Sequence, residues 1–401
     1  MAEKIVLAYS GGLDTSVAIR WLKEERGYDV IALTVDVGMD RDRETLQSRA
    51  MAAGASGYEW AESQETFIER FVFPALASGA LYQGYPLATA LSRPLIAREL
   101  VAVAEAEGAT AVAHGCTAKG NDQVRIDVSV QALAPELKVV APLREWKMDR
   151  ESEIAYAEEH SIPIEVTKKS PYSIDENLWG RSIETGVLED PWVEPPADVY
   201  QWTKSVSDAP DEPAYIEIGF EQGVPVSLDG GAVDAVSLVK KLNARAGEHG
   251  VGRIDSVEDR LVGIKSREIY EAPAGVTLLA AHDALEGLTL SKDQRRLKAR
   301  IAQEYAELVY NGLWYSAHHR DLAAYVRSTQ RYVTGTVRMK LHKGVATVVG
   351  RKSPRSLYDS SLATYDKGDQ FDASSAVGFI DIWGLPLRVQ SKAQDAAADA
   401  D

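Results

Sequence analysis

Short apolar runs alternate with amphipathic helical segments over the first part of the chain. Val17 and Trp21 stand at i and i+4, and Gly27 closes the helix of about three turns that they predict. Two later segments, Leu95–Glu107 and Asp149–His160, repeat this helical pattern. The predicted strands are Lys4–Tyr9, Val30–Val37, Thr110–Ala113 and Lys138–Ala141. The alternation predicts an α/β fold with a doubly wound, mostly parallel sheet covered by helices on both faces.

A loop-rich stretch then ends this pattern. Lys168–Tyr172 and the proline-rich Pro191–Pro196 place a domain boundary near residue 166. The remainder predicts an α+β domain, with helices at Ala232–Ala246 and around Leu297–Val309. Its two predicted hairpins pair Tyr215–Phe220 with Val224–Leu228, and Val333–Lys340 with Val345–Gly350. We therefore predict three parts: residues 1–166, residues 167–362, and a tail of residues 363–401 whose apolar segment, 376–389, packs on a neighbouring molecule.

Composition narrows the class of protein. A net charge of −16 over 401 residues argues against a protein built to grip nucleic acid. The single cysteine, Cys116, excludes an intramolecular disulfide, a cysteine-rich zinc site and paired-thiol chemistry. No leader opens the chain and no apolar stretch approaches the roughly 20 residues that span a bilayer, so we expect a cytoplasmic protein without a membrane partner. Adjacent His318 and His319 lack ligand spacing, and no metal site made by the protein alone is predicted.

The turn Ser10–Ser16 follows the first predicted strand and opens the first helix. Its backbone N–H groups and the helix dipole point at one place, and Gly11 and Gly12 let an anion approach closely. Asp14 suits that position chiefly if Mg²⁺ bridges it to phosphates. A serine-capped glycine turn without a ligand is the structural alternative. The turn lacks the ending of a P-loop and the three glycines of a dinucleotide site.

A second polar segment, His114–Arg125, follows a predicted strand and should face the first turn, because open α/β sheets gather ligands at the carboxyl ends of their strands. Asp122 can hold an α-ammonium group, while Thr117 and Asn121 can bond carboxylates. Lys119 and Arg125 can pair with a carboxylate or a phosphate. From spacing alone, a turn at Gly120–Asp122 with Asp122 as a helix cap is the commoner explanation of these residues.

The first turn resembles the PP-loop of the ATP pyrophosphatases, which are adenine nucleotide alpha hydrolase-like proteins. With it, three further segments make nearly the whole chain similar to the argininosuccinate synthase family: His114–Arg125, Asp175–Ser182 and Gly250–Asp255. The resemblance implies a PP-loop domain, a synthetase domain and a C-terminal oligomerisation arm. It also implies a ligase that joins citrulline and aspartate through a citrullyl-adenylate, forming AMP, diphosphate and argininosuccinate for arginine biosynthesis, with Mg²⁺ accompanying ATP and a homotetrameric assembly.

The resemblance also assigns residues by motif. It implies catalytic roles for Asp14, Lys119, Asp122 and Arg125. ATP is assigned to Ala8, Tyr9, Ser10, Gly11, Gly12, Leu13, Asp14, Thr15, Ser16, Val35 and Gly115. Aspartate is assigned to Thr117, Asn121 and Asp122, and citrulline to Tyr85, Asn121, Arg125, Ser173, Ser182, Glu258 and Tyr270.

Three positions depart from the family pattern. Ala90 stands where a citrulline-binding serine is expected, so that contact is lost or is supplied by Thr89, by Ser92 or by a water. Ala118 replaces a usual glycine and Cys116 a frequent alanine, which stiffens the loop without removing a polar ligand.

Two other classes of protein share the first turn. Another PP-loop adenylating enzyme, which thiolates tRNA, forms lysidine or uses glutamine, needs paired cysteines, a basic surface or a glutaminase nucleophile. A non-enzymatic nucleotide sensor needs no second domain filled with matching polar segments. The composition and length of the chain disfavour both.

Overall fold

The structure, a computed structural model, describes residues 2–39, 41–117, 119–146, 148–163 and 172–394. It divides the chain into two compact units, Met1–Arg355 and Ser356–Asp401. Ala118 and the domain boundary predicted near residue 166 lie outside the described residues. None of the described helices combines the length and the apolarity needed to cross a membrane.

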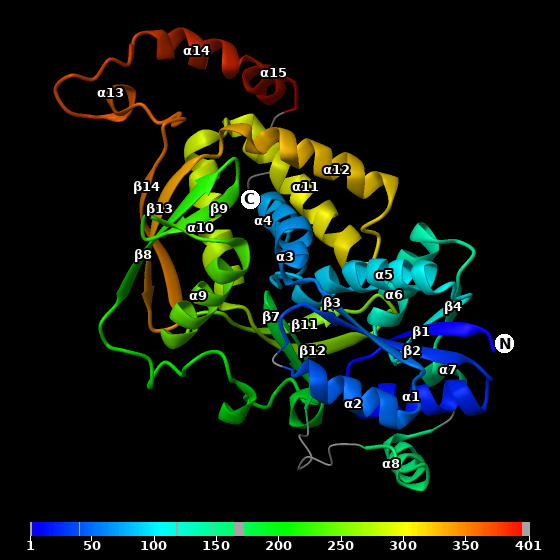
Figure 1. The fold of residues 1–401 in the computed structure, drawn as a ribbon. Helices are drawn as coiled ribbons and strands as arrows, with labels where there is room; N and C mark the ends of the chain where they lie inside the picture. The colour runs from blue at the N-terminus through cyan, green and yellow to red at the C-terminus, as the bar shows by residue number, and fades with distance from the viewer. Residues whose placement is uncertain (1, 40, 118, 147, 164–171, 395–401) are drawn as a thin grey trace. The chain divides into compact units, whose positions relative to one another are not determined.

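The first unit begins with a five-stranded parallel sheet of order β3-β2-β1-β4-β5 (Figure 1). Its strands are β1 (Lys4–Ala8), β2 (Asp29–Asp36), β3 (Gly57–Glu62), β4 (Ala111–His114) and β5 (Lys138–Val140). This order confirms the predicted doubly wound fold and the four predicted strands. We missed β3, because its sequence mixes glutamates with half-buried aromatic residues instead of forming an apolar run.

Helices cover both faces of this sheet. The central strand β1 is accordingly apolar on both faces, since successive side chains of a strand point to opposite sides. Ile5 and Leu7 belong to one core cluster, and Val6 belongs to the other. The first face is covered by α1 (Leu13–Glu24), α2 (Arg43–Ala53) and α8 (Arg150–Glu159), with the short α7 (Pro142–Glu145) beside α1. The second face is covered by α5 (Ala88–Glu107), which packs on α6 (Asp122–Leu133).

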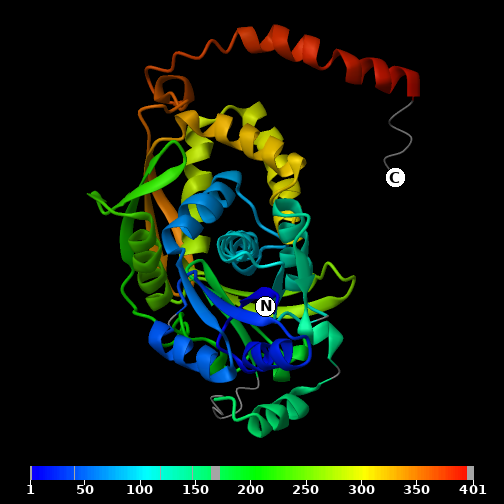
Figure 2. The same cartoon turned by 45° about the vertical axis from the view of Figure 1, so that its right-hand side comes forward.

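The predicted start of α5 at Leu95 was wrong. The helix runs through Pro94 and begins at Ala88, where the Tyr85 hydroxyl accepts a hydrogen bond from the Thr89 N–H at 2.6 Å. That bond satisfies a donor that the helix itself leaves free at its first turn. Figure 2 shows α5 nearly end-on, above the parallel sheet. The helix also contacts α11 (Lys292–Tyr310) of the second half of this unit.

Two antiparallel sheets follow within the same unit. One has the order β11-β12-β7-β6 and the other β10-β9-β8-β13-β14. The strands of the first are β6 (Ser173–Asn177), β7 (Gly180–Glu184), β11 (Arg253–Asp259) and β12 (Lys265–Glu271). The second contains β8 (Ala214–Glu221), β9 (Val224–Leu228), β10 (Gly231–Ala232), β13 (Gly335–His342) and β14 (Val345–Lys352). Both predicted hairpins, β8–β9 and β13–β14, are confirmed.

Helices complete this half of the unit. They are α3 (Gln64–Phe67), a π-helical turn at Ile68–Val72, α4 (Phe73–Ser78), α9 (Ala235–Glu248), α10 (Pro273–Thr289), α11 (Lys292–Tyr310) and α12 (Ala317–Thr329). Short 3₁₀ turns lie at Gly186–Glu189, Ala197–Val199 and Gln330–Tyr332. The prediction of helix from Ala232 was wrong at its start, because Ala232 pairs in β10 and Asp234 caps α9 by accepting from the Ser237 N–H.

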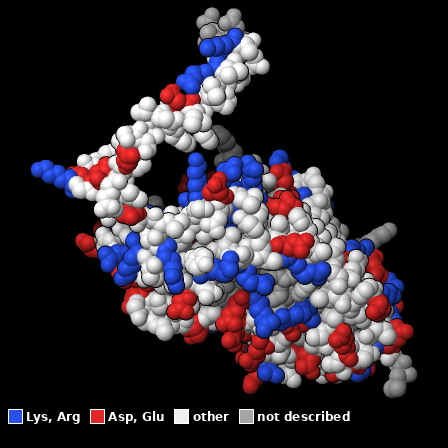
Figure 3. Space-filling model, turned by 90° about the horizontal axis from the view of Figure 1, so that it is seen from above, with Lys and Arg blue, Asp and Glu red and all other residues white. Residues whose placement is uncertain are grey.

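The second unit contains α13 (Ser360–Ala363), α14 (Ser375–Trp383) and α15 (Leu385–Gln394). Its apolar side chains are exposed, including Phe379 at 62%, Ile382 at 76% and Trp383 at 73%. Most of the surface of this segment is uncharged in the space-filling view (Figure 3). A stretch with this many exposed apolar side chains is typical of a segment that packs on another molecule.

Candidate active site

The turn after β1 has the backbone that an anion site requires. Gly11 has φ of 76°, and a Cβ there would lie 2.2 Å from the Leu46 side chain, so only glycine fits. The carbonyl of Gly12 accepts hydrogen bonds from the Ser16 N–H at 3.1 Å and the Ser16 hydroxyl at 2.8 Å. Ser16 is therefore buried and holds the turn, whereas Ser10 is exposed beside it.

The segment after β4 meets this turn. Ala8 and His114 are paired in register, which puts both strand ends at the carboxyl edge of the sheet. A Cβ on Gly115 would lie 2.7 Å from the Thr15 methyl group, so the two segments touch. A cavity at this junction is lined by six residues assigned to ATP: Ala8, Tyr9, Ser10, Thr15, Val35 and Gly115. Arg93, Cys116 and Asp175 also line it.

His114 fixes the end of β4. Its Nδ1 accepts from the Cys116 N–H at 3.2 Å, so Nε2 carries the proton and donates to Asp127 at 2.8 Å. Burial by itself raises the pKa of Asp127, but the hydrogen bonds from His114 and Arg144 outweigh it and leave that pKa lowered. The loop that carries the second polar segment is thereby tied to α6.

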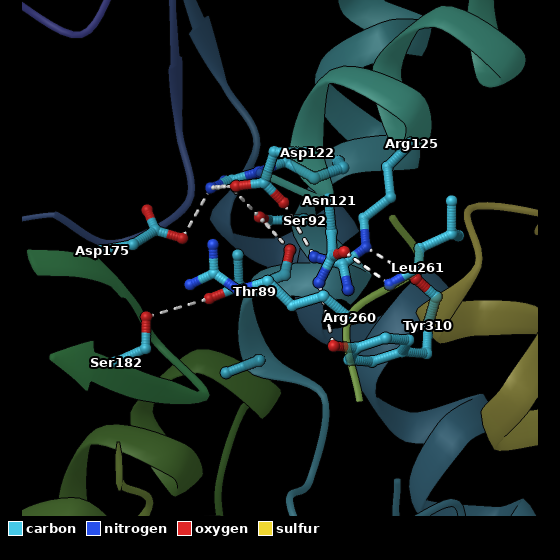
Figure 4. Close-up of polar contacts among 12 residues, drawn as sticks. Thr89, Ser92, Asn121, Asp122, Arg125, Asp175, Ser182, Arg260, Leu261 and Tyr310 are labelled. Atoms are coloured by element: carbon cyan, nitrogen blue, oxygen red, sulfur yellow. Dashed lines mark hydrogen bonds and ion pairs between the residues drawn. The ribbon is translucent and has the colours of Figure 1, made fainter. Parts of the chain in front are cut away.

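Asp122 lies between Arg93 and Arg125, and Figure 4 shows it beside Arg125 and near Asp175. Its carboxylate accepts from Arg93 Nη2 at 2.7 Å and from Arg125 Nη1 at 2.8 Å. Arg93 also donates to Asp175 at 2.6 Å. Burial by itself raises the pKa of Asp122, but the two guanidinium groups outweigh this and hold it far below its usual range. Asp122 therefore stays ionised and is no simple helix cap.

Asn121 is buried and both atoms of its amide are engaged (Figure 4). Its Nδ2 donates to the Tyr310 hydroxyl at 2.9 Å, and its Oδ1 accepts from the Leu261 N–H at 2.9 Å. Arg125 donates through Nε to the Tyr310 carbonyl at 2.7 Å. The end of α11 and the loop between β11 and β12 thus hold the start of α6.

One face of the four-stranded sheet carries the residues assigned to citrulline. Asp175, Ser182 and Tyr270 are successive cross-strand partners on β6, β7 and β12, so they share a face. Glu258 lies four residues after the β11 partner of Tyr270 and falls on that face too. Its carboxylate accepts from the Tyr270 hydroxyl at 2.8 Å. Ser173 lies on the same face two residues before Asp175, pairs opposite Glu184 and is exposed.

The position of the expected serine is buried in α5. Ala90 has no exposed surface, whereas the neighbouring Thr89 hydroxyl lies 3.4 Å from the Ser182 hydroxyl. The Ser92 hydroxyl donates instead to the Thr89 carbonyl at 2.8 Å and accepts from Arg93 at 3.0 Å. Thr89 is therefore the hydroxyl that the structure offers beside a residue assigned to citrulline.

Two aromatic pairs line the same region. The rings of Tyr85 and Tyr270 stack with centroids 3.8 Å apart, and those of Tyr82 and Tyr310 stack at 3.6 Å. Burial raises the pKa of Tyr85 and of Tyr270, so both remain neutral donors at ordinary pH. All four tyrosines are buried, so the two stacked pairs add apolar packing beside the residues assigned to citrulline.

Thr117 and Lys119, by contrast, are exposed. Arg260 approaches this loop, with Nη1 3.5 Å from the Lys119 carbonyl. It also contacts Glu184 and donates to Glu268 at 2.7 Å. Burial and the Glu184 carboxylate nevertheless raise the pKa of Glu268 to about 8.

Four contributors were missed: Arg93, Asp175, Arg260 and Tyr310. Asp175 begins one of the segments that carried the resemblance, so its motif offered a signal. Arg93 stands near Tyr85 and Ala90 in the sequence, and this proximity was a weaker signal. The sequence around Tyr310 reads as an ordinary amphipathic helix and offered none.

Together, the doubly wound sheet, the glycine turn after its first strand and the polar groups converging at its carboxyl edge define a nucleotide-binding domain of the HUP class. The family described as Arginosuccinate synthase N-terminal HUP domain matches residues 4–163. The Arginosuccinate synthase C-terminal domain matches residues 172–390. The chain belongs to the argininosuccinate synthase family.

Curated relatives agree with this assignment. An argininosuccinate synthase of Gloeobacter violaceus is 59% identical over 393 residues, covering 98% of this chain and 99% of that protein. One of Dehalococcoides mccartyi is 56% identical over 395 residues, covering 98% and 97%. One of Bacillus thuringiensis is 55% identical over 399 residues, covering 99% of each.

Proposed function

We propose that the protein joins L-citrulline and L-aspartate at the expense of ATP, yielding argininosuccinate, AMP and diphosphate in arginine biosynthesis. The observation that carries this proposal is the contact between Gly115 and Thr15, which joins the phosphate turn to the loop that leads into Asn121, Asp122 and Arg125. The family membership and the names of the relatives support the same reaction.

In the first step, the ureido oxygen of citrulline attacks the α-phosphorus of ATP. The new oxygen–phosphorus bond replaces the bond to the β-phosphate, and diphosphate leaves with its electron pair. A neutral ureido oxygen is a weak nucleophile, so the rate depends on orientation and on stabilising charge at phosphorus. The N–H groups at the start of α1 supply hydrogen-bond donors for that charge. The cross-strand partners Ser182 and Tyr270 orient citrulline.

In the second step, the amine of aspartate attacks the activated ureido carbon and AMP leaves. We assign Asp122 to binding the aspartate ammonium group. Because Arg93 and Arg125 keep the pKa of Asp122 far below its usual range, its carboxylate is a poor proton acceptor. Asp122 therefore orients the amine, and we do not assign it as the general base.

The residues at the phosphate turn fit Mg²⁺ carried by ATP. Asp14 lies in the first turn of α1, and the Glu153 carboxyl of α8 lies in hydrogen-bonding contact with it. Burial and the Asp14 carboxylate raise the pKa of Glu153 to about 8, and carboxylate oxygens such as that of Asp14 are the ligands that Mg²⁺ takes. Bound Mg²⁺ would neutralise phosphate charge. Asp14 is the residue we assign to hold it, with Glu153 behind it.

We further propose that the chain forms a homotetramer in the cytoplasm, where ATP is available. The exposed apolar side chains of α14 and α15, such as Phe379 and Trp383, support a role for this segment between subunits. Solution scattering tests the assembly: the full chain should be tetrameric, and a chain ending at Arg355 should be smaller than a tetramer. A monomeric full chain contradicts the proposal.

A product assay tests the reaction. The protein is incubated with ATP and Mg²⁺, with citrulline and aspartate added singly and together, and nucleotides are separated by chromatography. Stoichiometric AMP, diphosphate and argininosuccinate should form only when both amino acids are present. Formation of ADP, or AMP turnover that ignores either amino acid, contradicts the proposed function.

A further inference from the structure

Tyr310, the last residue of α11, reaches the site from an element to which the sequence assigned no role. Its side chain is 1% exposed. The hydroxyl accepts from Asn121 Nδ2 at 2.9 Å, as Figure 4 shows. It donates to Glu258 Oε1 at 2.7 Å. One hydroxyl therefore connects a residue assigned to both amino acids with a residue assigned to citrulline.

The order of donors in this chain of hydrogen bonds is determined. Glu258 already accepts from Tyr270, so the single proton of the Tyr310 hydroxyl goes to the other oxygen of Glu258. The Tyr310 oxygen must then accept, and the amide of Asn121 must present its NH₂ group to it. The Leu261 N–H on the Asn121 oxygen fixes the same orientation from the other side. Among the described residues, one N–H of Asn121 and the remaining lone pairs of Glu258 have no partner and can bind ligands.

The ring of Tyr310 is held in place by its neighbours, so its hydroxyl has a fixed position. It stacks on Tyr82 with an interplanar angle of 12°, and the Arg125 guanidinium lies 4.7 Å from its centroid. Two residues later Gly312 has φ of 77°, and a Cβ there would lie 2.7 Å from the Arg125 Cα. Only glycine lets the end of α11 come this close to α6, so the contact is built into the backbone.

We propose that Tyr310 is a positioning residue that couples the two amino-acid subsites. Citrulline at Glu258 and aspartate at Asn121 contact two groups that this one hydroxyl holds in place, so binding of one ligand firms the group that receives the other. This inference rests on the proposed function for the identity of the two ligands. It assigns Tyr310 no contact with ATP and no part in the chemical steps.

The test is Tyr310→Phe, which keeps the stacked ring and removes only the hydroxyl. Tyr305→Phe is the matched control, because Tyr305 lies on the same helix, has no exposed surface, and has a hydroxyl without a hydrogen-bond partner among the described residues. In Tyr310→Phe, the KM values for citrulline and for aspartate should each rise at least about twofold, because the Asn121 amide loses a neutral hydrogen bond and the Glu258 carboxylate loses a charge-assisted one. The KM for ATP and kcat should stay within about twofold, and Tyr305→Phe should match the wild type.

Calorimetric titration without ATP gives a second measurement that a purely structural role does not move. The dissociation constant for aspartate is measured with and without saturating citrulline. The wild type should bind aspartate more tightly when citrulline is present, and Tyr310→Phe should lose most of that difference. Unchanged coupling in Tyr310→Phe, or an equal rise in the KM for ATP, overturns the inference. A wild type that makes no AMP contradicts the proposed function instead, and the titration still decides the role of Tyr310.

Discussion

Replacing Asp122 with asparagine removes the negative charge that two buried guanidinium groups share. The side chain of Arg125 is 4% exposed, and Asp122 is its one carboxylate partner in the part of the chain that the structure describes. Arg93 keeps a second carboxylate, Asp175, at 2.6 Å. Asp122→Asn therefore leaves one buried cation unpaired and another half-compensated, with almost no change in side-chain volume.

The magnitude follows from this difference in pairing. Breaking a buried ion pair by removing one partner costs about 3–5 kcal/mol. Because the Asp122 side chain is 26% exposed, water compensates part of the loss, and we expect the lower end, about 3 kcal/mol in the free energy of unfolding. Asp175→Asn is the matched control. It removes one charge-assisted hydrogen bond but leaves Arg93 paired with Asp122, so it should cost about 1.5 kcal/mol.

Urea unfolding of the three proteins at pH 7 measures the stability difference. The two half-reactions are then separated: exchange of diphosphate into ATP with citrulline reports adenylation, and argininosuccinate formation reports the use of aspartate. Asp122→Asn should impair aspartate use more than exchange. Equal loss of both half-reactions rejects the role given to Asp122. A stability loss no larger than that of Asp175→Asn rejects the charge argument.

Three further changes test other parts of the site. Thr89→Val should raise the KM for citrulline about 2- to 12-fold while Thr89→Ser should not, and equal KM values would show that the Thr89 hydroxyl does not replace the missing serine. Gly115→Ala puts a Cβ 2.7 Å from the Thr15 methyl group. Titration should therefore show ATP binding weakened at least about fivefold, a cost of about 1 kcal/mol. Unweakened binding would show that the close approach of Gly115 to Thr15 does not shape the ATP site. The pKa of Glu268 is about 8 in the folded protein and 4.5 ordinarily. Its contribution to the free energy of unfolding is therefore fully present below about pH 4.5 and is lost as the pH rises through 8. Glu268→Gln should flatten that decline in urea unfolding, and an unchanged pH profile would contradict it.

Much of the fold was predictable, because burial on both faces leaves a simple pattern. The strands β1, β2, β4 and β5 are apolar runs, and the hairpins show regular alternation around turn residues. The failures occurred where another interaction outweighed the local pattern. The helix α5 begins at Ala88, where the Tyr85 hydroxyl accepts from the Thr89 N–H, and it includes Pro94, whereas β3 is a half-buried edge strand.

The site was predictable where ligand groups stand beside a motif. The turn Ser10–Ser16 and the segment from Gly115 to Arg125 meet as expected at the edge of the sheet. Arg93 and Tyr310 were not predicted, since their partners lie 29 and 189 residues away in the chain and only tertiary packing brings them together. Charge balance at Asp122 is likewise a property of the packed structure, because it depends on two arginines from different helices.

The central claim is that the ureido oxygen of citrulline attacks the α-phosphate of ATP. Citrulline labelled with ¹⁸O in the ureido group tests it directly, with mass spectrometry of the nucleotide and diphosphate after turnover with unlabelled ATP and aspartate. The mechanism predicts that the label leaves with AMP, because the attacking oxygen becomes a phosphate oxygen of AMP when the amine displaces it. Label found in diphosphate or released as water, with unlabelled AMP, would contradict it.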